Sequence, residues 1–167
     1  MMRIFGLAGW SGSGKTTLMT ALIPEFVSRG VTVSTVKHAH HSFDIDQPGK
    51  DSWRHRQAGA REVMVASAHR WALMHELRGG AEPSLEELLA RLSRVDLVLV
   101  EGFKRHAHPK IEVYRRALGK PLLHPDDRCV VAIAADEILA EFSVPFLPLS
   151  DPGAIAGFVL RHEGMVG

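Results

Sequence analysis

Residues 3–17 read RIFGLAGWSGSGKTT, and this stretch decides the fold. The apolar run Arg3–Ala8 predicts a buried β-strand, and the glycine-rich segment after it leads into a helical pattern that stops at Gly30. From Gly9 to Thr16 the residues match G-x-x-x-x-G-K-[ST], the phosphate-binding loop that joins a strand to a helix. Glycines let successive backbone N–H groups surround a phosphate, and the helix N-terminus adds partial positive charge. The stretch therefore predicts a nucleotide-binding α/β protein.

Each residue type in this loop has an expected role toward a nucleotide. Lys15 is suited to bridge the β- and γ-phosphates, and the hydroxyl of Thr16 is suited to ligate Mg²⁺. The expected nucleotide-binding residues are Gly9, Ser11, Gly12, Ser13, Gly14, Lys15, Thr16, Thr17, Gly102 and Asp136. No residue stands out as a catalytic base.

Hydrophobic periodicity and turn residues predict the other elements. Strands are expected at residues 31–36, 62–66, 71–75, 95–100, 111–115 and 130–134. Helices are expected from 51 or 52 to near 59, from 83 to about 92, and over 152–162. The two strands at 62–66 and 71–75 are close enough to form a hairpin. The pattern predicts a three-layer α/β P-loop NTPase fold with a mainly parallel sheet, an added β-hairpin and a single domain over residues 1–167.

Composition excludes several classes of protein. With 46% apolar and 23% charged residues the chain has the average make-up of a globular domain, so disorder and coiled coil are excluded. Its net charge of +1 gives no field that would favour nucleic acid or an anionic membrane. The single cysteine, Cys129, excludes an internal disulfide and fits a reducing compartment. We therefore expect a cytoplasmic protein that contacts neither nucleic acid nor membrane.

A second part of the nucleotide site is predicted where the apolar run 95–100 ends. Glu101 follows this run directly and is placed to hold Mg²⁺, either itself or through water. The N–H of Gly102 is expected to approach the γ-phosphate. The alternative is that Glu101 only caps the edge of a strand.

Base recognition is weakly specified. The Asn-Lys-x-Asp motif that reads guanine in Ras-like GTPases is absent, and the nearest analogue is Ala134-Ala135-Asp136. Asp136 is able to accept hydrogen bonds from guanine N1 and N2. Capping of a following helix is an equally good explanation of Asp136.

The segment 37–52 is polar and rich in histidine, and its length favours a functional loop. Its histidines are candidate ligands of a transition metal, or contacts for an anionic ligand. Asp44 and Asp46 are candidate outer ligands of Mg²⁺. The expected surface for a ligand or partner consists of Lys37, His38, His41, Lys50, Arg54, Arg56, Lys104 and Arg105. A solvated charged face is the simpler alternative.

Several segments carry a family resemblance together with the phosphate loop. They are Val36-Lys37-His38 with His41, Phe43-Asp44-Ile45-Asp46, Pro48-Gly49-Lys50-Asp51-Ser52, residues 54–60, and Glu101-Gly102-Phe103-Lys104. Over residues 3–136 the chain resembles the MobB family, the molybdopterin-guanine dinucleotide biosynthesis protein B family. The resemblance implies a GTP-binding adaptor in molybdenum cofactor biosynthesis, with Mg²⁺ dependence, slow GTP hydrolysis and a homodimer. It also implies that the partner is the molybdenum cofactor guanylyltransferase, which attaches GMP to molybdopterin, and that molybdopterin itself is a candidate ligand.

Two other functions fit a phosphate loop. A metallochaperone-type GTPase shares the fold and the histidine richness, but it usually has a cysteine in its metal motif, and Cys129 stands alone. A small-molecule kinase needs an arginine-rich lid, for which residues 115, 116 and 120 form the available cationic cluster. This function ranks last.

Overall fold

The computed structural model describes residues 2–39, 43–104, 106–139 and 142–165, and these form two compact units. One unit consists of Met1–His38 with Leu85–Gly167, and the other is the insertion Ala39–Ser84. The prediction of a single domain stays a prediction. No helix within the described ranges is both long enough and apolar enough to span a membrane.

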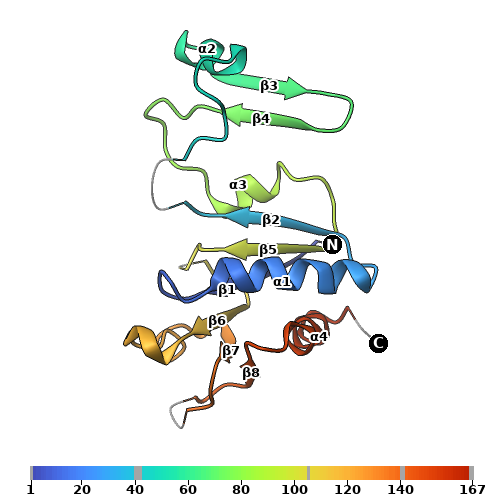
Figure 1. Ribbon diagram of the computed structural model, residues 1–167, viewed down its shortest axis with the longest axis vertical. Coiled ribbons are helices and arrows are strands. Elements are labelled where there is room, and N and C mark those ends of the chain that lie inside the picture. Colours follow the sequence, from blue (N-terminus) through green and yellow to red (C-terminus); the bar gives the residue numbers. More distant parts are fainter. Residues whose placement is uncertain (1, 40–42, 105, 140–141, 166–167) are drawn as a thin grey trace. The chain divides into compact units, whose positions relative to one another are not determined.

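The larger unit is built on a six-stranded sheet in which all neighbouring strands run parallel (Figure 1). The strand order is β2-β5-β1-β6-β7-β8. The strands are β1 (Arg3–Ala8), β2 (Val33–Lys37), β5 (Leu97–Glu101), β6 (Lys110–Tyr114), β7 (Val130–Ala135) and β8 (Phe146–Pro148). The helices are α1 (Lys15–Ser28), α3 (Leu85–Leu89), the 3-10 helix η1 (Arg116–Leu118) and α4 (Pro152–His162). The α/β class and the parallel sheet are thus confirmed, whereas β8, three residues long and ending in proline, was not predicted from the sequence.

Helices cover both faces of this sheet, as alternate residues of β5 show. Leu97 and Leu99 are buried in one apolar cluster with side chains of α1 and α4. Val98 and Val100 are buried in a second cluster with Leu85 and Leu89 of α3. A strand buried on both faces reads as a continuous apolar run, which explains the pattern at 95–100. The three-layer arrangement is therefore confirmed.

The insertion contains α2 (Asp51–Gln57) and an antiparallel hairpin of β3 (Glu62–Ala66) and β4 (Trp71–His75), as predicted. Met64 pairs with Leu73, and both side chains lie on a largely exposed face of the hairpin with Trp71. Val63, on the opposite face, is buried. One face of this small sheet therefore remains apolar and uncovered within its own unit.

Two charged side chains are buried on β6, Lys110 and Glu112. The ammonium of Lys110 donates to the carbonyls of Lys104 and His106, both at 2.9 Å, and to the carboxylate of Asp127 at 3.1 Å. Glu112 accepts from the backbone N–H groups of residues 123 and 124 at 2.8 and 3.0 Å. Burial raises the pKa of Glu112, although these two N–H groups act in the opposite direction. β6 therefore anchors the segments that follow β5 and η1.

Candidate nucleotide-binding site

The phosphate loop connects β1 to α1 and has a backbone that only glycine adopts easily. Gly9, Gly12 and Gly14 have φ angles of 143°, 81° and 95°. A Cβ atom at Gly9 would lie 2.5 Å from the carbonyl oxygen of Val113 and 2.8 Å from Oγ of Ser13. The glycines in the motif are therefore required both by backbone conformation and by the close approach of β6.

The N-terminus of α1 is suited to an anion. Its N-cap is Gly14, which has no side chain to accept from the first-turn N–H groups, and that turn contains no acidic residue. These N–H groups have no acceptor within the helix and carry the positive end of its dipole. The buried Oγ of Ser13 also lacks a hydrogen-bond partner among the described residues. Donors without acceptors around a glycine cradle fit a phosphate group.

Lys15, Thr16 and Glu101 meet at the carboxyl ends of the central strands. The ammonium of Lys15 donates to the carbonyl of Trp10 at 2.8 Å, and the hydroxyl of Thr16 donates to Oε1 of Glu101 at 3.0 Å. Lys37, opposite Glu101 in the register of β2 and β5, places its ammonium 3.7 Å from the same oxygen. Burial chiefly lowers the pKa of Lys15, and Glu101 raises it less than burial lowers it. The structure thus brings together the two halves of the site that the sequence predicted.

The donor set fits Mg²⁺. A threonine hydroxyl and a carboxylate oxygen lie within hydrogen-bond distance of each other at the end of the loop, and Mg²⁺ prefers oxygen ligands combined with phosphates and water. Among the described residues no three His, Cys, Asp or Glu side chains are grouped to hold a metal by themselves. A cation at this position would therefore depend on nucleotide oxygens as well.

The chain after Glu101 is held in an unusual conformation. Gly102 has φ of 97°, and a Cβ atom there would lie 2.8 Å from Cβ of His38. Phe103 also has a positive φ, 47°, and its ring lies 5.0 Å from the ring of His38. Backbone in this region is costly for residues other than glycine, and such positions often mark ligand contacts. The N–H of Gly102 donates to the carbonyl of Leu7 on β1 at 3.5 Å, so a γ-phosphate would have to replace this acceptor, and that contact stays a prediction.

Trp10, inside the loop, lies close to two cations from other segments. The ammonium groups of Lys104 and Lys120 lie 4.9 and 5.9 Å from the centre of its ring. Its indole N–H donates to the carbonyl of Pro121 at 2.8 Å. Lys104 also lowers the pKa of Lys15, which places both lysines in one electrostatic environment. Lys104, predicted from the sequence, therefore lies at the loop, and Lys120 joins it.

Asp136 follows β7 and is paired with Arg115, which follows β6. Nη1 of Arg115 donates to both carboxylate oxygens at 2.8 and 2.7 Å, and its Nε donates to the carbonyl of Ser13 at 3.1 Å. Arg115 was considered above only as part of a kinase lid. Sequence reasoning missed its contact with the loop because that contact depends on which strands are neighbours.

Several of the predicted ligand-surface residues lie in the insertion, where Arg56 is surrounded by carboxylates. Its guanidinium contacts Asp44 at 2.8 Å, Asp46 at 3.1 Å and Glu76 at 2.8 Å. The N–H of residue 46 and then Arg56 lower the pKa of Asp44. These contacts give Asp44, Asp46 and Arg56 a structural role within this unit, and their proposed contacts with Mg²⁺ or a ligand stay predictions.

The remaining members of that surface differ in their surroundings. Lys50 and Arg54 are exposed in the insertion. His40, His41 and Arg105 lie outside the described residues, so the predictions made for them stay predictions.

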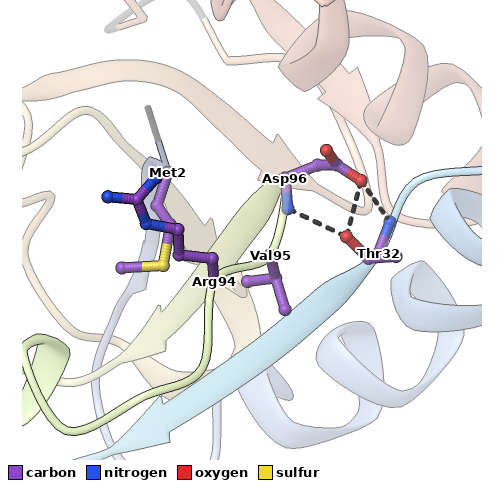
Figure 2. A pocket seen from close by; sticks show the side chains of 5 residues that line it. All are labelled: Met2, Thr32, Arg94, Val95 and Asp96. Atoms are coloured by element: carbon purple, nitrogen blue, oxygen red, sulfur yellow. Dashed lines mark hydrogen bonds between the residues drawn. The ribbon is translucent and has the colours of Figure 1, made fainter.

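An open depression of about 530 Å³ lies at the opposite edge of the sheet (Figure 2). It is lined by Met2, Thr32, Arg94, Val95 and Asp96. Asp96 accepts from the backbone N–H of Thr32 at 2.9 Å, and its own N–H donates to the Thr32 hydroxyl at 2.9 Å. Ligands of parallel α/β sheets bind outside the carboxyl ends of the strands, whereas this depression is at the amino ends. It is therefore not part of the nucleotide site.

The sequence is similar to a family model and to known proteins over most of its length. A family model described as "Molybdopterin guanine dinucleotide synthesis protein B" (MobB) matches residues 4–136. The chain is 43% identical to the molybdopterin-guanine dinucleotide biosynthesis adapter protein of Escherichia coli (strain K12), covering 96% of this chain and 93% of that protein. It is 42% identical to the protein of the same name from Haemophilus influenzae, covering 93% and 86%.

A solved structure has the same fold. The crystal structure of a molybdopterin-guanine biosynthesis protein B superposes with a TM-score of 0.75 at 28% identity, covering 95% of this chain and 99% of that chain. The phosphate loop, the Glu101 segment and these similarities over nearly the whole length lead to one conclusion: the chain belongs to the molybdopterin-guanine dinucleotide synthesis protein B (MobB) family.

Proposed function

We propose that this protein is a GTP-binding adaptor in the synthesis of molybdopterin guanine dinucleotide, and that it assists the enzyme that attaches GMP to molybdopterin. The observation that carries the proposal is the uncapped glycine cradle at α1 with Thr16 hydrogen-bonded to Glu101. That arrangement suits a Mg²⁺-bound triphosphate, and the names of the relatives supply the pathway.

Different groups of the site would contact different parts of the nucleotide. The first-turn N–H groups of α1 would bind phosphate oxygens, and Lys15 would exchange the Trp10 carbonyl for the β- and γ-phosphates. Bound Mg²⁺ would neutralise phosphate charge beside Thr16 and Glu101.

The binding experiment compares GTP, GDP, ATP and ADP, with and without Mg²⁺, by calorimetry. Lys15→Ala should weaken triphosphate binding at least about tenfold, because a charge-assisted contact with phosphate is lost. Arg94→Ala is the matched control, since Arg94 lies at the opposite edge of the sheet. Equal affinities of Lys15→Ala and the parent protein for triphosphate would refute the site.

The surface for the pterin phosphate or the partner enzyme is proposed to include Lys37, His38 and Lys104 beside the phosphate loop. Lys50 and Arg54, exposed in the insertion, are proposed separately as contacts for an anionic ligand or partner. A γ-phosphate contact at Gly102 would reposition Lys104, two residues further on. Hydrogen exchange over residues 43–56 and 102–104 tests this: protection should rise with GTP·Mg²⁺ and fall with GDP. If protection from hydrogen exchange is the same with GTP·Mg²⁺, with GDP and without nucleotide, the proposed switch is refuted.

A homodimer is proposed through the uncovered face of the β3–β4 hairpin. Met64 and Trp71 are 63% and 65% exposed there, and a two-stranded sheet alone is marginally stable in water. A second copy of this apolar face would cover both. Light scattering should give twice the chain mass for the parent protein and the monomer mass for Trp71→Ser, whereas a monomeric parent would exclude the dimer. We place the protein in the cytoplasm, where its partner enzyme would act.

A further inference from the structure

The sequence lacks a guanine-reading motif, yet two neighbouring strands place a guanidinium and a carboxylate beside the phosphate loop. β6 and β7 are parallel, and Tyr114 lies opposite Ala135 in their register. Arg115 and Asp136, the first residues after these two strands, therefore leave the sheet at the same edge. Because parallel α/β sheets bind ligands outside this edge, the pair lies where a nucleotide site extends from its phosphates.

The guanidinium of Arg115 connects the carboxylate to the loop. Nη1 chelates both oxygens of Asp136, and Nε donates to the carbonyl of Ser13. A Cβ atom at Gly14 would lie 3.4 Å from Nε and 3.5 Å from Nη2, so the guanidinium lies along the loop. Nη2 donates to none of the described residues.

We propose that Arg115 is the positioning residue of the nucleobase subsite, where it holds Asp136 as the acceptor for the guanine base; this rests on the nucleotide binding proposed above. A carboxylate has about four lone-pair positions, so Asp136 accepts from Arg115 and still has acceptors for a base. Guanine presents two adjacent donors, N1–H and the N2 amino group. Adenine presents one amino group next to the N1 acceptor, and that acceptor would repel the carboxylate.

Arg115 acts in this subsite as a positioning residue. Asp136 is about half exposed, and without Arg115 its side chain would be free to rotate. Because Arg115 also donates to the carbonyl of Ser13, it holds Asp136 at a constant separation from the phosphate loop. The base and the phosphates of one nucleotide would therefore be bound together. A lysine would supply one point charge and could not form the same fork of contacts with Ser13 and Asp136.

The chain offers a matched control one residue further along. Arg116 and Glu137 form a pair of the same charges at 3.6 Å, with side chains 68% and 55% exposed. Among the described residues, neither side chain forms a hydrogen bond or an ion pair with the phosphate loop. A general electrostatic effect would therefore be the same for both arginines, whereas base recognition would depend on Arg115 alone.

The test measures the affinities of GTP, ATP and xanthosine triphosphate for full-length parent protein and four variants. In Arg115→Gln the preference for GTP over ATP should fall roughly tenfold or more, with little change in ATP affinity, because hydrogen bonds to a charged group are lost or misplaced. Arg115→Lys should recover part of the preference. Asp136→Asn should lose the preference for GTP over ATP. Its affinity for xanthosine triphosphate should rise, since an amide donates to the C2 carbonyl of xanthine. Arg116→Gln should match the parent.

Three results would overturn the inference. Equal losses of GTP and ATP in Arg115→Gln would assign Arg115 a structural role in the loop. A parent preference for GTP that persists in Asp136→Asn would place base recognition elsewhere, and equal binding of GTP and ATP by the parent would exclude a guanine subsite. A parent that binds no triphosphate at all is a different result, because it would overturn the proposed function itself.

Discussion

Replacement of Lys110 by methionine is the sharpest test of how the segment after Glu101 is held. The side chain is 1% exposed, and its ammonium donates to two carbonyls and a carboxylate. Methionine has a similar shape but no donor, so Lys110→Met leaves the carbonyls of Lys104 and His106 and the carboxylate of Asp127 without this partner. The change therefore removes contacts while adding almost no strain.

The expected loss of unfolding free energy follows from the acceptors that lose their partner when the ammonium is removed. Breaking a buried ion pair by removing one partner costs about 3–5 kcal/mol. Asp127 retains the N–H of Cys129 and is 28% exposed, so water compensates it in part and the lower end applies. We expect the free energy of unfolding to fall by about 3 kcal/mol, out of a total of roughly 5–15 kcal/mol. For a chain of this size that lowers Tm by roughly 6–12 °C.

Urea denaturation and a thermal melt measure the effect, with Lys104→Met as the control. Lys104 contacts Trp10 at the surface of the loop, and loss of a cation–π contact of this kind costs about 1 kcal/mol or less. A double-mutant cycle of Lys110→Met with Asp127→Asn should show that the second change costs less once the first is present. A Lys110→Met protein within about 1 kcal/mol of the parent would refute the reasoning, because the buried ammonium would then contribute little.

Three further predictions concern the loop, the metal and pH. Gly9→Ala should lower Tm and nucleotide affinity far more than Gly49→Ala. Both glycines have positive φ, but a new Cβ at Gly9 would lie 2.5 Å from a carbonyl oxygen, whereas nothing lies within 4 Å at Gly49. Equal effects of the two changes would contradict the clash. Thr16→Val should remove the Mg²⁺-dependent part of GTP binding, and an unchanged Mg²⁺ titration would exclude Thr16 as a ligand. Burial, and then the charges of Lys110 and His106, lower the pKa of His108 to about 4. The unfolded chain therefore takes up this proton first, and the free energy of unfolding should fall by up to about 3 kcal/mol as pH drops from about 6.5 toward 4. Urea titrations across that range should show a flatter dependence for His108→Leu, and identical slopes would disprove the assignment.

Local sequence was sufficient for the parts of the site that lie within one segment. The phosphate loop could be read because its glycines, Lys15 and Thr16 act through backbone conformation and helix position over a few residues. The strand ending at Glu101 could be read because a strand buried on both faces is continuously apolar. The resemblance of neighbouring motifs to the MobB family then indicated the family.

The tertiary structure decided which of these segments meet. The order β2-β5-β1-β6-β7-β8 places Glu101 against Thr16 and sends Arg115 and Asp136 out of the sheet side by side, although they are separated along the chain. It also shows that Arg56, expected to bind a ligand, is held by three carboxylates within its own unit. The sequence does not distinguish a charged side chain that is solvated from one that is paired within the protein or available to a ligand. Their role is set by non-local neighbours, because the energy of a charge depends on what lies within a few ångströms of it and on how much water it keeps.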